Sequence, residues 1–199
     1  VRGRVRLEDV ARPTTIIGTV EGATIQEIVT VCNEESDNFL AESLYLLASA
    51  ERYGMGSYRA AHQLEESFWK DLGVDSRDVQ PADGSGLSRE NYLTPEALTA
   101  LLREYQNAEW WVESLPLSGR SGTLRYRLSQ NGMAGRVRAK TGTLTGISAL
   151  SGYVTTNSSN RVAFSIMANH YTSGTGTIRN KIDDRSEEHT SELQSPLCI

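Results

Sequence analysis

The first part of the chain carries its hydrophobic residues three and four positions apart, which is the period of amphipathic helices. A capping box, Thr24 to Glu27, begins the first of these helices, and a second apolar helix runs from Phe39 to Tyr53, where Gly54 ends it. A third helix is predicted from about Ser57 to Leu72. The first helix has one apolar face, made of Ile25, Ile28, Val29 and Cys32. We therefore expect Cys32 to be a core residue.

The pattern changes in the second half of the chain. One more helix starts at Thr94-Pro95-Glu96, with a proline in its first turn, and strands are predicted over 136–141, 147–156 and 161–169. Helices followed by strands indicate an α+β fold, a helical cluster packed on an antiparallel sheet. Between the helical part and the strands, four large apolar residues are predicted to pack in the core: Trp110, Trp111, Leu115 and Leu117.

Composition narrows the class of protein. With 199 residues, 38% of them hydrophobic and 23% charged, the chain reads as one globular domain or most of one, and no apolar run is long enough to span a membrane. The formal net charge of −5 and the lack of a basic patch argue against a nucleic-acid partner. Two cysteines and three scattered histidines fit no metal-ligand spacing, so neither a metal nor another cofactor is expected.

Both ends of the sequence look cut. Residues 1–7 alternate like a half-buried strand, with no initiator methionine and no leader, so we expect a fragment boundary there. The string that starts at Arg185 resembles the conceptual translation of a sequencing adapter. We therefore expect residues 1–184 to be the C-terminal part of a domain and 185–199 to be non-native read-through; the alternative is a natural polar tail.

A Lys-Thr-Gly triplet, residues 140–142, carries the first sign of chemistry. It leads into an apolar strand and places an ammonium, a hydroxyl and a backbone without a side chain along one edge. The ammonium and the hydroxyl can bind a carboxylate through charge-assisted hydrogen bonds, and glycine lets a ligand approach the backbone. The triplet alone is weak evidence, because three common residues recur by chance.

A second triplet, Ser36-Asp37-Asn38, lies just before the second helix. Its polar residues could simply cap that helix, yet together the two triplets make up two thirds of the signature of penicillin-binding proteins and serine β-lactamases. The remaining third is a Ser-x-x-Lys motif. Ser67-Phe68-Trp69-Lys70 has this spacing, but it follows the Ser-x-Asn triplet and lies within an ordinary amphipathic helix, so we interpret it as a chance match.

Over about residues 11–184 the chain resembles the C-terminal part of a D-alanyl-D-alanine carboxypeptidase of the low-molecular-mass class C penicillin-binding proteins. The specific stretches are EESDNFLAE at 34–42, DGSGLSR at 83–89, GTL at 122–124 and AKTGTLTGISALSGYV at 139–154. The resemblance implies a β-lactamase/transpeptidase-like α+β fold with five antiparallel strands, incomplete in this chain. It also implies peptidoglycan stem peptides as substrate, β-lactam antibiotics as inhibitors, and a periplasmic or otherwise extracytoplasmic location.

The resemblance further implies acyl transfer through a serine nucleophile. By analogy, Ser36 relays a proton, Asn38 donates its amide to the substrate, Lys140 holds the substrate carboxylate, and the backbone amide of Thr143 is an oxyanion donor. Substrate-binding roles fall on Thr141, Gly142, Leu87, Arg89, Leu144 and Thr145. No nucleophile is expected within this chain; the serine and its lysine should lie upstream of Val1, so the fragment alone should be inactive.

Two other functions stay open. A class A β-lactamase shares both triplets and needs a carboxylate that activates the deacylating water, for which the stretch 90–94 is the nearest candidate. A non-catalytic peptidoglycan-binding protein could keep the carboxylate site without a nucleophile. The sequence does not separate carboxypeptidase from endopeptidase activity, since both use the same motifs, and gives neither organism nor oligomeric state.

Overall fold

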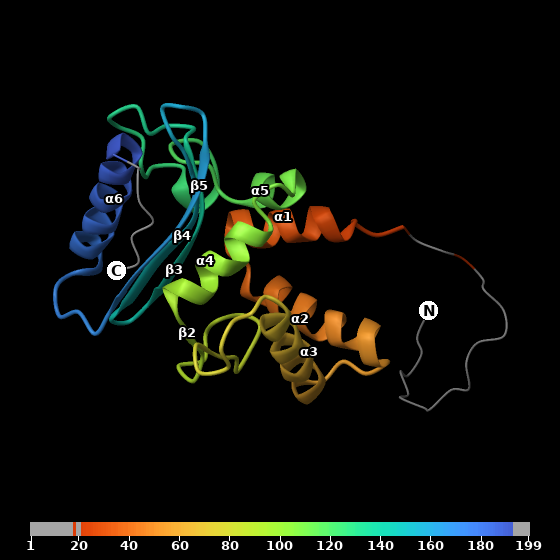
Figure 1. The fold of residues 1–199 in the computed structure, drawn as a ribbon. Coiled ribbons are helices and arrows are strands. Elements are labelled where there is room, and N and C mark those ends of the chain that lie inside the picture. Colours follow the sequence, from red (N-terminus) through yellow and green to blue (C-terminus); the bar gives the residue numbers. More distant parts are fainter. Residues whose placement is uncertain (1–17, 19–20, 193–199) are drawn as a thin grey trace, which may run out of the picture.

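The computed structural model of the protein describes residue 18 and residues 21–192. The strand predicted over 1–7 lies outside the described residues. Within them, all helices but the last precede the main sheet along the chain, and that sheet is antiparallel (Figure 1). The predicted α+β fold, a helical cluster on an antiparallel sheet, is confirmed.

Three helices form the first layer, as the hydrophobic pattern predicts. They are α1 (Ile25–Glu35), α2 (Asn38–Tyr53) and α3 (Tyr58–Asp71). The capping box at the start of α1 is confirmed, because the Thr24 side chain accepts from the Glu27 backbone while Glu27 accepts from the Thr24 backbone at 2.7 Å. Cys32 is buried, as expected for the core side of α1.

A connecting region follows the three helices. It holds a two-stranded pair, β1 (Val79–Gln80) with β2 (Tyr92–Leu93), then α4 (Pro95–Glu104), α5 (Glu109–Ser114) and a short 3-10 helix, η1 (Gly122–Leu124). Leu115 is buried here and Trp111 packs against the core, as predicted. The same prediction is wrong for Trp110, which is 44% exposed, because neighbouring positions on a short helix cannot both face the core.

The main sheet has the order β3-β4-β5, from β3 (Val137–Leu144), β4 (Ile147–Thr155) and β5 (Arg161–Asn169). The sequence pattern ends the first of these strands at residue 141, but the structure continues it through the Lys-Thr-Gly triplet to Leu144, which pairs with Ile147. The continuation is possible because Thr145 and Gly146 form a two-residue turn in which Gly146 has a positive φ of 73°.

The sheet is buried on both faces. Side chains that alternate along each strand divide between two clusters. One cluster lies under α6 (Thr175–Glu192) and includes Val137, Ala139, Leu150, Val154 and Ile182; the other lies under α4 and α5 and includes Leu102, Val112, Leu115 and Tyr153. Figure 1 shows α6 on one side of the sheet and α4 with the helical cluster on the other.

Two glycines lie where a neighbouring element fills the space that a side chain would need. A Cβ on Gly152 of β4 would lie 2.5 Å from the Ala139 Cα atom of β3, and a Cβ on Gly84 would lie 2.8 Å from the Tyr45 ring in α2. Neither position leaves room for a side chain without movement of the neighbouring element. The first contact fixes the spacing of β3 and β4 next to the Lys-Thr-Gly triplet.

The last helix extends beyond the predicted end of the native sequence. α6 continues without a break past residue 184, and Ser186 is buried with its hydroxyl donating to the Ile182 carbonyl at 2.8 Å. The assignment of residues 185–199 to read-through stays a prediction. Among the described helices, none combines the length and apolar character that crossing a membrane requires.

Candidate active site

A sharp joint between α1 and α2 presents the first of the predicted site residues, Ser36. Ser36 ends α1 with a left-handed backbone, φ 57° and ψ 48°, and Asp37 begins α2 by accepting the Leu40 backbone N–H at 2.9 Å. Asp37, rather than Ser36 or Asn38, is thus the helix cap. A left-handed serine costs about 1–2 kcal/mol, so the fold holds this hydroxyl in place against a local penalty.

The ammonium of Lys140 lies directly against this joint. Its Nζ donates to Ser36 Oγ at 2.7 Å and to the Thr141 carbonyl at 3.0 Å. Strand alternation accounts for the direction, because Lys140 lies on the face of β3 opposite to buried Ala139 and therefore points toward the helices. The two triplets, 104 positions apart, meet at one hydrogen bond.

Burial shifts the pKa values of Lys140 and of its neighbour Cys32. It lowers the pKa of the Lys140 ammonium, while the nearby Cys32 thiol acts in the opposite direction. Burial also raises the pKa of Cys32, an effect that the charge of Lys140 only partly offsets. The Cys32 thiol donates to the Asp37 carbonyl at 3.6 Å. The cysteine therefore packs beneath the joint as a neutral thiol, and Lys140 loses its proton more readily than an exposed lysine.

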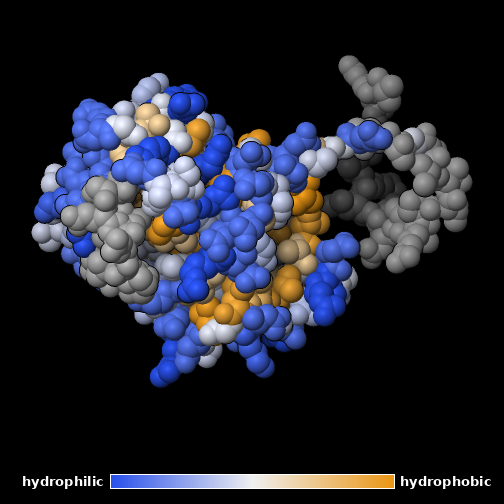
Figure 2. Space-filling view, turned by 45° about the horizontal axis from the view of Figure 1, so that its top comes forward, coloured by the Kyte–Doolittle hydropathy of each residue, from blue (hydrophilic) through white to orange (hydrophobic). Residues whose placement is uncertain are grey.

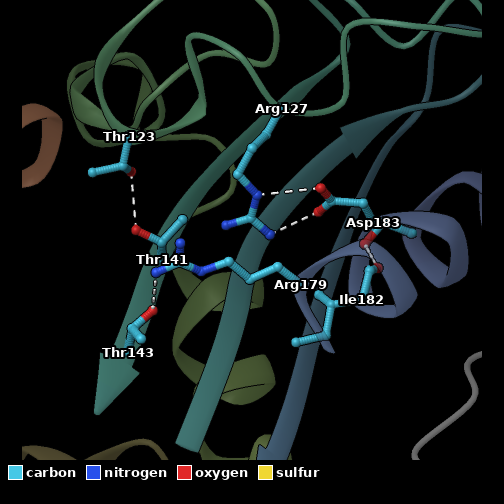
Figure 3. A network of polar contacts seen from close by, with 8 residues as sticks. Thr123, Arg127, Thr141, Thr143, Arg179, Ile182 and Asp183 are labelled. Carbon is cyan, nitrogen blue, oxygen red and sulfur yellow. Dashed lines mark hydrogen bonds and ion pairs between the residues drawn. The ribbon is translucent and has the colours of Figure 1, made fainter. Parts of the chain in front are cut away.

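The threonines of β3 lie on the other face of the strand. Thr141 Oγ1 donates to Thr123 Oγ1 of η1 at 3.0 Å, and the exposed Thr143 hydroxyl accepts from Arg179 Nη2 of α6 at 3.1 Å (Figure 3). One edge of β3 thus offers an ammonium on one side and two hydroxyls on the other. Among the described strands, β3 pairs only with β4, so the edge beyond Lys140 stays open.

A second contact ties the helical cluster to η1. Glu34 of α1 accepts from the Ser121 hydroxyl at 2.7 Å, and that hydroxyl accepts from the Leu117 backbone at 2.9 Å. The next residue, Gly122, has a positive φ of 49°, and a Cβ there would lie 2.6 Å from the Glu34 carbonyl. Through this contact α1 positions η1 and hence Thr123 beside Thr141.

The Asp83–Arg89 loop reaches the far end of the same edge. The Asp83 carboxylate accepts from the backbone of Gly86 and Ser88, and Glu42 of α2 accepts from Gly84 and Ser85, both at 3.0 Å. Burial by itself would raise the pKa of Asp83, but hydrogen bonds from Asn91, Ser88 and Gly86 outweigh it and the net pKa is lowered. The loop is thus held by the carboxylates of Asp83 and Glu42, and its own hydrogen bonds keep Asp83 ionised at neutral pH.

Arg89 extends from this loop and donates to the Thr145 carbonyl at 3.3 Å. The contact joins the loop to the turn between β3 and β4. Leu87, in the same loop, is 54% exposed. Two of the predicted substrate-binding residues, Arg89 and Thr145, therefore lie together at one end of the edge.

The structure brings most of the predicted site residues together along β3. Ser36 contacts Lys140, and Thr141, Gly142, Thr143 and Leu144 follow in the same strand. Asn38 begins α2 with an exposed side chain that no described hydrogen bond holds. In contrast, Ser67 and Lys70 are both exposed on α3, and Lys140 bonds to Ser36 and not to Ser67. The interpretation of Ser67 and Lys70 as a chance match stays a prediction.

Sequence reasoning missed three residues of this site. Glu34 and Thr123 belong to stretches that carry the family resemblance. The sequence signal for their contact is Gly122, because a glycine lets the backbone of η1 approach Glu34 closely. Arg179 had no sequence signal, because a lone arginine in a polar helix is typical of a solvated face. Only tertiary structure brings it to β3.

Comparisons with known proteins agree with this geometry. The model of the D-Ala-D-Ala carboxypeptidase 3 (S13) family matches residues 1–189. The D-alanyl-D-alanine carboxypeptidase of Actinomadura sp. (strain R39) is 39% identical over 155 residues, which cover 74% of this chain and 29% of that protein. The chain thus spans about three tenths of the length of this curated relative.

Two solved structures share the fold. Penicillin-binding protein 4 (dacB) from Haemophilus influenzae, in complex with a β-lactam, matches with a TM-score of 0.75 and 24% identity, covering 83% of this chain and 41% of that one. The TLA-3 extended-spectrum β-lactamase matches with a TM-score of 0.63 and 18% identity, covering 84% and 64%. The β-lactamase/transpeptidase-like fold expected from the sequence is confirmed. By the family match and the curated relative, this chain belongs to the D-Ala-D-Ala carboxypeptidase 3 (S13) family.

Proposed function

We propose that the chain is the C-terminal part of a serine-type D-Ala-D-Ala carboxypeptidase or endopeptidase that acts on peptidoglycan stem peptides. The observation that carries this proposal is the 2.7 Å hydrogen bond between Lys140 and Ser36 at the open edge of β3. It unites the two triplets that serine acyl-transfer enzymes of this fold use. Family membership and the carboxypeptidase named above support the same reaction.

The proposed reaction is acyl transfer. A serine hydroxyl attacks the carbonyl carbon before the terminal D-alanine, the C–N bond breaks, and water later hydrolyses the acyl-enzyme. The proton from the nucleophile passes to the leaving nitrogen by way of Ser36. Lys140 suits this path, because its lowered pKa eases proton exchange with the Ser36 oxygen that it already contacts.

The open edge of β3 suits an extended peptide. A substrate that adds as a further strand would bond to the backbone of β3, and the Thr143 N–H would serve as one oxyanion donor. Such a donor contributes about 3 kcal/mol to transition-state stabilisation in other hydrolases. Gly142 leaves the approach of a substrate to this edge clear, because it has no side chain. No other part of the described protein crowds the position, since the atom nearest to a Cβ there would be Ala149 Cβ at 3.5 Å.

The nucleophile is proposed to lie upstream, in a segment that packs on the helical cluster. Figure 2 shows hydrophobic residues gathered over the helical half of the molecule. Phe39 is 78% exposed and Leu47 50% exposed, although both belong to α2, whose first residue is Asn38. Large exposed apolar side chains on the helix that the triplet begins indicate a further element that packs there. The lengths of the relatives support the same interpretation.

The same site accounts for the proposed ligands. A β-lactam has a carboxylate and a strained amide in the positions of the stem peptide's terminal carboxylate and scissile bond, so we expect β-lactams to acylate the protein. Peptidoglycan lies outside the cytoplasm, so an extracytoplasmic location follows from the proposed substrate. The class A β-lactamase alternative shares the fold and the two triplets, but the family match favours the carboxypeptidase.

Covalent labelling with a fluorescent penicillin tests the proposal. The protein, extended upstream to its natural start, should be labelled, and Lys140→Ala should lose most of the label. Lys70→Ala is the matched control, because Lys70 is an exposed lysine on α3 and belongs to the chance Ser67 motif. Label on Ser67, or loss of label in Lys70→Ala, would refute the upstream nucleophile. A folded protein that takes no label would favour a non-catalytic peptidoglycan-binding protein.

A further inference from the structure

Arg179 places a second positive charge at the edge of β3, on the side away from Lys140. Its Nη2 donates to Thr143 Oγ1 at 3.1 Å, and Figure 3 shows its guanidinium between the Thr141 and Thr143 hydroxyls and the body of α6. Arg179 is exposed, and no ion pair among the described residues includes it. The guanidinium therefore has a neutral hydroxyl as its partner and donors to spare.

The position of Arg179 is fixed by the residue one turn further along α6. Asp183 accepts two hydrogen bonds from Arg127, at 3.2 Å from Nε and 2.7 Å from Nη2, and both side chains are mostly buried. Arg127 lies just after η1, the element that carries Thr123. Because residues four apart share a helix face, this bidentate pair turns Arg179 toward β3.

The start of α6 is tied to the sheet as well. Tyr171 shares a hydrogen bond with Ser148 at 2.9 Å, and its hydroxyl also lies 3.5 Å from Thr175 at the first position of α6. Ser148 is paired with Thr143 across β3 and β4. α6 is thus attached to β4 before Arg179, through Tyr171, and to the segment after η1 beyond Arg179, through Asp183, so the guanidinium is held at the sheet edge.

We propose that Arg179 is a specificity-determining residue that binds the free terminal carboxylate of the substrate. The inference rests on the proposed function and places that carboxylate at the open edge of β3, between Lys140 on one face and the Thr141 and Thr143 hydroxyls on the other. A guanidinium next to two hydroxyls can donate to the carboxylate while it keeps its bond to Thr143. The arrangement selects ligands that end in a carboxylate over the same ligands with a neutral end.

Rates of acylation test this selection in the protein extended to its natural start. Benzylpenicillin and its methyl ester share the reactive ring, but only the acid has the anionic group. We expect Arg179→Ala to lower the acylation rate constant for the acid about tenfold, the effect of one charge-assisted hydrogen bond, and to leave the rate for the ester unchanged. Arg179→Lys should restore part of the rate for the acid, because it keeps the charge and loses the fork.

Lys181→Ala is the matched control, since Lys181 is an exposed cation on the same helix and lies two residues further along. It should change neither rate. Equal losses for acid and ester in Arg179→Ala, or no loss for either, would overturn the role of Arg179 while the proposed function stands. A wild-type protein that neither compound acylates would overturn the proposed function, and the inference with it.

Discussion

Two glycines on neighbouring strands should respond in opposite ways to the same added methyl group. Gly152 of β4 faces the backbone of β3, where a new Cβ would lie 2.5 Å from Ala139 Cα and nearer still to the Arg138 carbonyl. Ordinary contacts begin near 3.4 Å, so β3 would have to move by more than about 0.9 Å. Because both neighbours are backbone, no side chain can turn aside to relieve the contact.

We therefore expect Gly152→Ala to lower the free energy of unfolding by about 3 kcal/mol, at the upper end of the cost of overpacking. Gly142→Ala is the matched variant on β3, where the nearest atom lies at 3.5 Å. It should change stability by less than about 0.5 kcal/mol, because it creates no close contact. Its methyl group would instead obstruct the open edge, so acylation by penicillin should fall at least about tenfold.

Urea unfolding and penicillin acylation, measured on the same two variants, check the pair. A Gly152→Ala protein as stable as the wild type would show that the spacing of β3 and β4 is not limited by this contact. A Gly142→Ala protein with normal acylation would place the substrate elsewhere than at this edge. The reasoning requires one variant to lose stability and the other to lose reactivity.

Three further outcomes follow from the site. Lys140→Ala should weaken acylation by penicillin and by peptide substrates alike, and unchanged rates would refute its proposed role. Burial lowers the pKa of Lys140 in the folded state, so between that pKa and 10.5 the protein takes up a proton when it unfolds. The free energy of unfolding, measured in urea and compared with that of Lys140→Met, should therefore rise with pH in this window. A fall would contradict the burial effect. Glu34→Ala removes the partner of Ser121 and should lower the free energy of unfolding by about 1–2 kcal/mol. Acylation should also become slower, because Thr123 is no longer held beside Thr141. A less stable variant with full activity would show that Glu34 does not position Thr123.

The helices and the two triplets could be predicted from sequence because their signals are local. The capping box at Thr24 and the strand with Lys140 follow from residue types at short spacing. The extension of β3 to Leu144 was harder, since it depends on pairing with Ile147 across the turn at Gly146. Short-range patterns identify elements, while strand ends depend on partners.

The surroundings of the site could not be predicted in the same way. Arg179 reaches Thr143 only because α6 lies on one face of the sheet, and Glu34 reaches Ser121 only because α1 lies on the other side. Each contact joins residues that are far apart in the chain and of common types. The strand positions were nevertheless informative, because alternation along β3 already separates Lys140 from the threonines.

The left-handed backbone of Ser36 has a consequence for any attempt to redesign this protein. Glycine adopts φ 57° without a Cβ penalty, so a search guided by backbone preference alone would choose glycine at this joint and predict a stabler chain. That substitution would delete the hydroxyl oxygen that accepts from Lys140. The joint between α1 and α2 is therefore a position where selection for stability and selection for chemistry favour different amino acids, and the chain carries the less stable of the two.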